Sequence, residues 1–142
     1  MLVRLMYASR AAAGLDTEEV NAILRRSREN NAREGITGAL CLCATGRLFI
    51  QVLEGGRAAV NRRYNRIVAD PRHTEATLLH YEEIALRRYA GWAMGHVNMA
   101  RLNPAVVLKY SEQATLDPWA VSGAASAAMF DEMIASAAIM GK

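Results

Sequence analysis

Residues 36–56 of this 142-residue chain have the sequence ITGALCLCATGRLFIQVLEGG, in which two apolar runs flank a short turn. The first run covers residues 36–42, and the second covers residues 48–53 with Gln51 as its polar member. Apolar runs of this length on either side of a glycine-containing turn are typical of a β-hairpin. The stretch therefore predicts two neighbouring strands, and the elements on either side of it can be placed from there.

An amphipathic helix is expected on each side of the hairpin. The first covers residues 17–31, because Asp16 and Glu19 form a box-like cap and Gly35 stops the helix. Its apolar face carries Val20, Ile23, Leu24 and Ser27. The second helix follows Gly55-Gly56 and is broken at Asp70-Pro71. Its apolar face carries Val60, Tyr64, Ile67 and Val68.

Three further strands complete the pattern. Residues 1–7 form the first strand, residues 8–15 a loop, residues 78–84 a fourth strand and residues 93–99 a fifth. The order β-α-β-β-α-β-β is that of an α+β, ferredoxin-like sheet with both helices on one face. That arrangement leaves the other face of the sheet without a cover.

The tail of the chain is expected to provide this cover. Asn103-Pro104 and Asp117-Pro118 each place a capping residue before a proline, which predicts helices over about 104–111 and 118–139. The second helix has few charges and is rich in alanine and methionine, so it is expected to be buried. The chain then divides into a domain of residues 1–98 and a helical extension of residues 99–142 packed on the sheet.

Composition and charge restrict the class of protein. The chain has 17 Lys plus Arg against 14 Asp plus Glu and is 52% hydrophobic, which excludes wholesale disorder. It has no run of about 18 apolar residues and no signal-peptide pattern, so a cytoplasmic protein without a membrane span is expected. Cys41 and Cys43 share a strand, so neither a disulfide nor a zinc site is expected.

Standard catalytic and metal-binding signatures are missing. The sequence has no Walker loop, no GxGxxG and no His-Glu-x-x-His, and its three histidines show no metal-ligand spacing. An enzyme is therefore not expected. Polar residues in core-like contexts stand out instead: Tyr7, Ser9, Asn30, Asn31, Gln51 and the segment Trp92-Ala93-Met94.

These residues belong to a set of motifs that closely resembles one family. The motifs are Tyr7-x-Ser9, residues 31–38 (NAREGITG), residues 49–55 (FIQVLEG) and Trp92-x-Met94. In this order and spacing they resemble the BLUF family, sensors of blue light using FAD, of the short stand-alone type. The resemblance covers about residues 1–98, and residues 103–142 match nothing diagnostic.

The resemblance implies non-covalent binding of FAD between the two helices. Ile23 and Ile67 would sandwich the flavin ring, Asn31 would hydrogen-bond its pyrimidine edge, and His73 would lie near that edge. Arg33 is a guess for the phosphates. The cofactor-binding set that the resemblance implies is Ile23, Ser27, Asn30, Asn31, Ile36, Gln51, Arg66, Ile67, Asp70 and His73.

The resemblance also implies the photochemistry. Tyr7 would give an electron and then a proton to the excited flavin, and Gln51 would rearrange its hydrogen bonds by rotation or tautomerisation. The absorption would shift to the red without a covalent bond to the flavin. Ser9 would belong to the switch, and Trp92 and Met94 would transmit the change along the last strand.

Two alternatives from other classes stay open, and so does the output. A ferredoxin-like sheet can bind RNA or a small ligand, although the strands lack the exposed aromatic residues that stack on bases. A small acyl-phosphate-type hydrolase is the enzymatic alternative. A yellow purified protein would favour the flavoprotein. We expect an unidentified downstream protein partner, no nucleic acid or membrane partner, and a homodimer or larger assembly.

Overall fold

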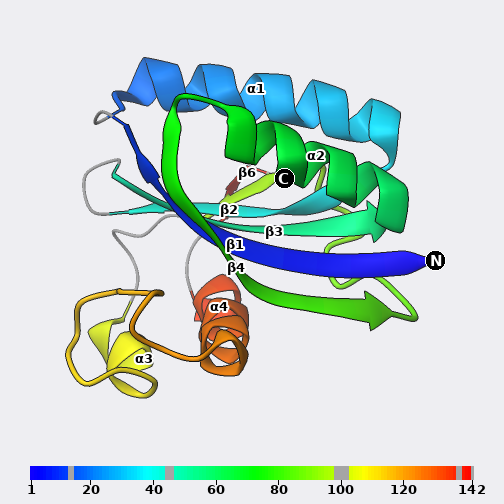
Figure 1. Ribbon diagram of the computed structural model, residues 1–142. Coiled ribbons are helices and arrows are strands. Elements are labelled where there is room, and N and C mark those ends of the chain that lie inside the picture. Colours follow the sequence, from blue (N-terminus) through cyan, green and yellow to red (C-terminus); the bar gives the residue numbers. More distant parts are fainter. Residues whose placement is uncertain (13–14, 44–46, 98–102, 137–138, 142) are drawn as a thin grey trace.

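The computed structural model describes residues 1–12, 15–43, 47–97, 103–136 and 139–141. Helices lie on both sides of a central sheet (Figure 1). The elements are β1 (Leu2–Ala11), α1 (Thr17–Glu34), β2 (Thr37–Cys43), β3 (Leu48–Gly56), α2 (Arg57–Ala69), β4 (His73–Ile84), β5 (Gly95–Val97), α3 (Pro104–Leu108), α4 (Gly123–Ser136) and β6 (Ile139–Gly141).

The sheet is mixed, with the strand order β4-β1-β3-β2-β5-β6. The hairpin of β2 and β3 is antiparallel, β1 pairs antiparallel with both β3 and β4, and β5 runs parallel to β2. The expected ferredoxin-like fold, with α1 and α2 on one face, is confirmed. The pairing register of β1 and β3 places Tyr7 directly opposite Gln51.

The first helix, α1, begins and ends where local chemistry demands it. The Asp16 carboxylate accepts a hydrogen bond from the Glu19 amide at 2.8 Å, and Gly35 ends α1 in the left-handed conformation with φ 68°. Because no residue before Gly35 stops the helix, α1 runs to Glu34 and not to residue 31 as predicted. On α2, Val60 is fully buried, but Val68 was wrongly assigned to the apolar face and is 50% exposed.

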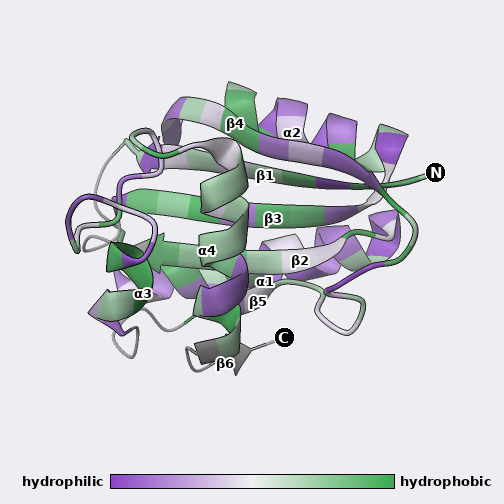
Figure 2. Ribbon diagram, turned by 90° about the horizontal axis from the view of Figure 1, so that it is seen from below, coloured by the Kyte–Doolittle hydropathy of each residue, from purple (hydrophilic) through white to green (hydrophobic). Residues whose placement is uncertain are grey.

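Two layers of core lie on the two faces of the sheet. Side chains alternate along β1, so Leu5 and Tyr7 pack with the α1 and α2 side while Met6 and Ala8 pack with the tail side. The tail contributes Met129, Phe130 and Met133 of α4, all buried. Figure 2 shows α4 lying across the strands on this second face. The tail helices therefore cover the face that α1 and α2 leave open, as predicted.

Several strand boundaries differ from those predicted. Residues 8–11 continue β1 and are not a loop, because the Ala11 and Ala12 amides donate to carbonyls of Arg47 and Arg72 on either side. For the same reason β4 begins at His73 and not at residue 78. The fifth strand is limited to Gly95–Val97, and the predicted positions 98–99 lie outside the described residues.

The tail follows the predicted caps only in part. Asn103 caps α3 by accepting from the Ala105 amide at 3.0 Å, but the helix ends at Leu108 and not at 111. The second tail helix is present as α4, but its predicted start at residue 118 is wrong, because Asp117 accepts from the Trp119 amide and holds a turn. Ser122 instead caps α4, which ends at Ser136 and not at the predicted residue 139. Ile139–Gly141 form a short strand beside β5 that was not predicted. Among the described residues, no helix is long and apolar enough to cross a membrane.

Candidate functional site

A cavity of about 300 Å³ lies between α1, α2 and the sheet face that these helices cover. The side chains that line it come from both helices, the first three strands and the turn before β4. Most of the predicted site residues line it: Tyr7, Ile23, Ser27, Asn30, Asn31, Gln51, Arg66, Ile67, Asp70 and His73. These residues reach the same cavity from widely separated positions in the sequence.

A chain of two hydrogen bonds runs through the floor of the cavity. The Tyr7 hydroxyl donates to Oε1 of Gln51 at 2.5 Å, and Nε2 of Gln51 donates to the sulfur of Met94 at 3.2 Å. All three side chains are buried. Because a carboxamide has a distinct donor end and acceptor end, these two partners define one orientation of the Gln51 amide.

The segment that contains Met94 is fastened to the site from two elements. Nδ2 of the buried Asn31 donates to the Ala93 carbonyl at 3.0 Å, and Nε of Arg28 donates to the Met94 carbonyl at 3.1 Å. The Gly38 amide of β2 donates to the Trp92 carbonyl at 3.0 Å. The bond to Ala93 uses one of the two N–H groups of the Asn31 amide, so the amide keeps hydrogen-bonding capacity for a ligand in the cavity.

A second polar contact lies at the end of the cavity where β1 meets β4. The Ser9 hydroxyl lies 2.7 Å from Nδ1 of His73, and the His73 ring packs against Phe49 with centroids 4.9 Å apart. Burial lowers the pKa of His73, and the nearby Arg72 acts in the same direction, whereas Asp70 opposes them. The pKa is lowered overall, so the imidazole is neutral at pH 7. Hydrogen bonds from Arg72 lower the pKa of Asp70 to about 2, so its carboxylate is ionised.

The Tyr7 phenol is held in its neutral form. Burial raises its pKa well above the ordinary value, and the neighbouring Tyr64 and Asp70 act in the same direction. The Tyr64 ring lies with its centroid 5.5 Å from that of Tyr7. A buried, protonated phenol with one strong acceptor can release its proton only toward that acceptor, which here is Gln51.

Arginines also line the cavity, and only Arg66 among them was predicted from the sequence. Arg26, Arg63 and Arg72 line the cavity beside the predicted Arg66. Arg63 and Arg66 each lie 3.0 Å from Glu34, and although burial raises the pKa of Glu34, these arginines lower it overall. Arg26 lies three residues after Ile23, so the helical period places both on the same face of α1 and would have indicated Arg26 as well. Arg33, the guess for the phosphates, does not line the cavity and bonds to Asn30.

Four predicted residues lie behind the cavity wall. Ser9 contacts His73, and Ile36 is buried in the core layer beneath α1. Met94 contacts Gln51 from the segment before β5, so the prediction that Trp92 and Met94 lie on the last strand is wrong. The Trp92 amide closes a turn on the Tyr89 carbonyl, and its ring packs against Tyr89 on the tail side of the sheet.

The cavity has the chemistry of a site for a planar heteroaromatic ring. Ile23 and Ile67 supply apolar walls from the two helices, and the Asn31 and Gln51 amides supply donors and acceptors for ring carbonyls and nitrogens. Its volume is at the lower end of the roughly 300–1,000 Å³ typical of small-molecule sites. Within the described part of the chain, no group of three or more His, Cys, Asp or Glu is placed to hold a metal ion.

Comparisons with known proteins agree with this chemistry. The family model of sensors of blue light using FAD, BLUF, matches residues 2–95. Subunit beta of the photoactivated adenylate cyclase of Euglena gracilis is 41% identical over 88 residues, which are 62% of this chain and 10% of that protein. The chain thus spans about a tenth of the length of the curated relatives that it matches.

Solved structures of similar proteins cover nearly the whole chain. BlrB, a BLUF protein in its dark state, is 34% identical with a TM-score of 0.77, covering 94% of this chain and 95% of that chain. BlsA in its photo-activated state is 27% identical with a TM-score of 0.82 and the same two coverages. The matched family region contains the cavity residues and the Tyr7, Gln51 and Met94 contacts. The chain therefore belongs to the BLUF family of blue-light sensors that use FAD.

Proposed function

We propose that this blue-light sensor binds FAD non-covalently in the cavity and reports light by rearranging the hydrogen bonds of Gln51. The observation that carries the proposal is the bond from the Tyr7 hydroxyl to Gln51 Oε1 at the wall of the cavity. It joins a phenol that can lose an electron and a proton to an amide that can present either a donor or an acceptor.

The residues on the cavity wall fit a flavin. Ile23 and Ile67 would contact the two faces of the ring, and the Asn31 amide would bind its polar edge with its unused hydrogen-bonding groups. The volume suits the ring system better than a whole dinucleotide. A bound flavin supplies blue-light absorption and a strongly oxidising excited state. The remaining residues that we propose to hold it are Ser27, Asn30, Arg66, Asp70 and His73.

Tyr7 and Gln51 perform the protein's part of the photochemistry. When Tyr7 loses an electron, its phenol becomes strongly acidic, and Gln51 Oε1 is the acceptor in place for the proton. After the electron and the proton return, the Gln51 amide is left rotated or tautomerised. A hydrogen-bond exchange of this kind supplies about 1 kcal/mol, which is enough for a modest population shift in a soft element.

The segment before β5 would receive the change first. In the structure, Met94 accepts from Gln51 Nε2, so a rearranged amide no longer donates to this sulfur. Trp92 lies two residues away and packs on Tyr89, whose amide donates to the buried Glu54 at 2.7 Å. Tyr89 and Arg88 in turn contact Asp131 of α4. This route would connect the cavity to the tail.

We propose that the tail is the output element and that the chain divides into a sensor domain of residues 1–98 and an extension of residues 99–142. The support is the α4 face, where Met129, Phe130 and Met133 are buried against the sheet. The output would pass to a protein partner or to a second copy in a homodimer or larger assembly. A cytoplasmic location stays a prediction that cell fractionation tests.

The alternative functions gain no support. An RNA-binding ferredoxin-like sheet exposes one face for stacking on bases. Here α1 and α2 cover one face and α4 lies across the other, and the cores on both faces are buried. The matching family is one of sensors and not of hydrolases.

Purification and illumination of the chain test the proposal. The protein should be yellow, release its flavin completely on denaturation, and show an absorption shift to longer wavelength under blue light that reverses in the dark. Chromatography of the released flavin distinguishes FAD from FMN. A colourless protein that cannot be reconstituted with FAD, or a flavin that stays attached after denaturation, would contradict the proposal.

A further inference from the structure

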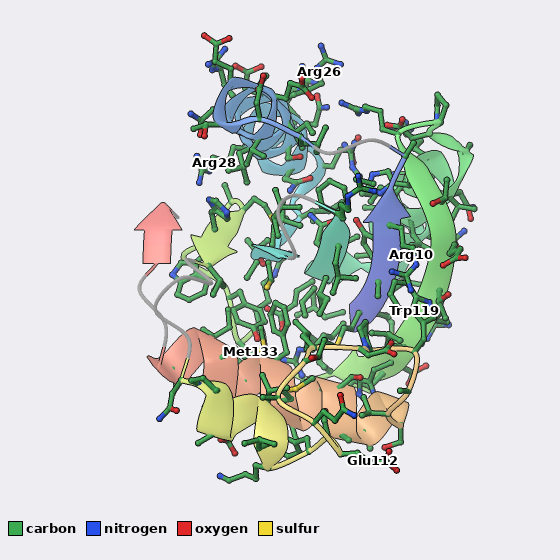
Figure 3. All side chains as sticks on the ribbon, turned by 90° about the vertical axis from the view of Figure 1, so that its left-hand side faces the viewer. Arg10, Arg26, Arg28, Glu112, Trp119 and Met133 are labelled. Atoms are coloured by element: carbon green, nitrogen blue, oxygen red, sulfur yellow. The ribbon has the colours of Figure 1, made fainter. Side chains whose placement is uncertain are left out.

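The tail contacts the sheet at a second place, near the end of the cavity where β1 meets β4. Trp119 lies in the connection between α3 and α4, and its Nε1 donates to the Thr77 hydroxyl of β4 at 2.9 Å. The Arg10 guanidinium of β1 lies 4.2 Å from the centroid of the Trp119 ring, within cation–π distance. Arg10 and Trp119 lie next to each other on the sheet side of the tail (Figure 3). This contact fixes the tail to two strands at once.

The same strands carry cavity residues on their other side. Ser9 directly precedes Arg10, and because side chains alternate along a strand, Ser9 faces the cavity side while Arg10 faces the tail. His73, which lines the cavity and contacts Ser9, is the first residue of β4. Arg10 therefore lies one residue from Ser9, the partner of His73, on β1, and Thr77 lies four residues from His73 on β4.

The β1–β4 pairing is irregular between these two sets of residues. The register shifts between Ala8 and Arg10, and Glu75 has a φ of 53°, a left-handed conformation that residues other than glycine rarely adopt. Nε of Arg10 donates to the Glu75 carboxylate at 2.6 Å, and the Thr77 hydroxyl donates to the Glu75 carbonyl at 2.9 Å. Arg10, Glu75, Thr77 and Trp119 thus form one connected group built on a bulge.

We propose that this group, the bulge contact, is a second path from the flavin cavity to the tail. Any movement of His73 against Ser9 displaces the bulge beside it, and the bulge positions both partners of Trp119. The inference rests on the proposed function, because flavin photochemistry is the source of the movement. Arg10 and Thr77 act as positioning residues, since neither of them lines the cavity.

This path is separate from the one through the segment before β5. That route reaches α4 through Arg88 and Tyr89 at Asp131, whereas the bulge contact reaches the connection before α4 at Trp119. The two routes share no residue between the cavity wall and the tail. Variants can therefore interrupt each route without touching the other.

The two tryptophans of the chain allow each route to be observed directly. Trp92 lies on the route through the segment before β5, and Trp119 lies in the bulge contact. Labelling with 5-fluorotryptophan gives two ¹⁹F resonances, assigned by Trp92→Phe and Trp119→Phe. Spectra of the flavin-loaded full chain in the dark and under blue light are recorded together with its absorption.

The expected result is a light-induced displacement of both resonances in the wild type. Thr77→Val, which removes the acceptor of the indole N–H, and Arg10→Lys, which keeps the charge but loses the planar stacking, should each reduce the Trp119 displacement by about twofold or more. The Trp92 displacement and the red shift should stay unchanged. Thr115→Val, on an exposed residue of the same connection, is the matched control.

Three outcomes would overturn the bulge contact as a path. In the first, the Trp119 resonance does not move although the red shift forms. In the second, it moves as far in Thr77→Val and Arg10→Lys as in the wild type. In the third, its movement is lost in Arg88→Gln, which interrupts only the other route. A protein without flavin or without a red shift would instead refute the proposed function, and the second path would fall with it.

Discussion

At the scale of single residues, the Gln51 amide has two partners of unequal strength. Its oxygen accepts a short bond from the Tyr7 phenol, whereas its nitrogen donates to the sulfur of Met94, a weak acceptor. Turning the amide therefore sacrifices little on the Met94 side. The orientation of Gln51 in the structure therefore depends mainly on its bond to Tyr7.

Substitution of the two partners should separate flavin binding from the light response. Gln51→Leu keeps the volume of the side chain but has neither donor nor acceptor, so the protein should bind flavin and lose the light-induced red shift. Tyr7→Phe should also lose the shift and lengthen the flavin fluorescence lifetime, because the electron and proton donor is gone. Gln113→Leu, in the exposed connection of the tail, is the control. A normal red shift in either site variant would contradict these roles.

The buried Tyr7 phenol should also make stability depend on alkaline pH. Its pKa is raised above 10.0 in the folded chain, so above pH 10 the unfolded chain loses a proton that the folded chain keeps. Stability is therefore fully present below pH 10 and falls above it, by about 1.4 kcal/mol per pH unit for this group. Urea unfolding at pH 9 and pH 11 should show the wild type losing about 1.4 kcal/mol relative to Tyr7→Phe. If the difference in stability between wild type and Tyr7→Phe is the same at pH 9 and pH 11, Tyr7 ionises equally in the folded and the unfolded chain.

At the scale of elements, the close contact of β2 and β3 requires Gly38. A Cβ at this position would lie 1.9 Å from the Val52 carbonyl oxygen, and the Gly38 amide also holds the Trp92 carbonyl. Val52 is the neighbour of Gln51. The absence of a side chain at residue 38 therefore lets β2 lie close to β3, which carries Gln51, while its amide holds the segment that contains Met94.

Gly38→Ala should therefore destabilise the chain by about 2 kcal/mol or more, since the strands must separate to admit the methyl group. The light response should weaken as well. Gly91→Ala is the matched control: a Cβ there meets nothing within 4 Å, and its effect should stay within about 0.5 kcal/mol. Urea unfolding of both variants measures the difference. Equal stability of the two would refute the assigned role of the β2–β3 contact.

Sequence patterns predicted the elements that are fixed by local chemistry. Residues within one or two helical turns determine the Asp16 cap and the Gly35 stop of α1. The same holds for the apolar faces of α1 and α2. The extension of β1 to Ala11 depends on hydrogen bonds to Arg47 and Arg72, which lie far along the chain. Such tertiary pairing has no local signature in an alanine-rich stretch.

The same distinction explains which site residues were found. Tyr7, Asn31 and Gln51 stand out because each is polar in an apolar context, and the family resemblance supplied their expected roles. The position of Trp92 and Met94 before β5 depends on the turn at Tyr89 and on bonds from β2 and α1. The Asp117 turn shows that one capping motif has two local outcomes, and only packing decides between them.

At the scale of the whole molecule, the sheet separates the cavity on one face from the tail helices on the other. The cavity lies on the α1 and α2 side, and α4 with its buried Met129, Phe130 and Met133 lies on the other. β1 and β3 contribute side chains to both layers, so a change on one face has only one strand thickness to cross. This arrangement suits the transfer of a small change to the tail.

A chain shortened to end at Val97 should keep its flavin and red shift, since the cavity residues precede that point. It should expose the apolar side chains of the second face, among them Met6, Ile50 and Val52, and self-associate. Sedimentation and light scattering measure this. A chain ending at Ser136, which lacks only β6 and the residues around it, is the control. If the shorter chain is as soluble as the full chain and has the same oligomeric state, α4 is not a cover.

A rearrangement of the Gln51 amide under light can be measured directly by infrared spectroscopy. The chain has two glutamines, so Gln113→Asn leaves Gln51 as the one site for side-chain ¹³C and ¹⁵N labelling. Light-minus-dark infrared difference spectra of labelled and unlabelled protein then isolate the bands of this amide. We expect the label to displace bands in the difference spectrum that recover with the dark state. If the protein shows the red shift but its difference spectra are identical with and without the label, light does not rearrange the Gln51 amide.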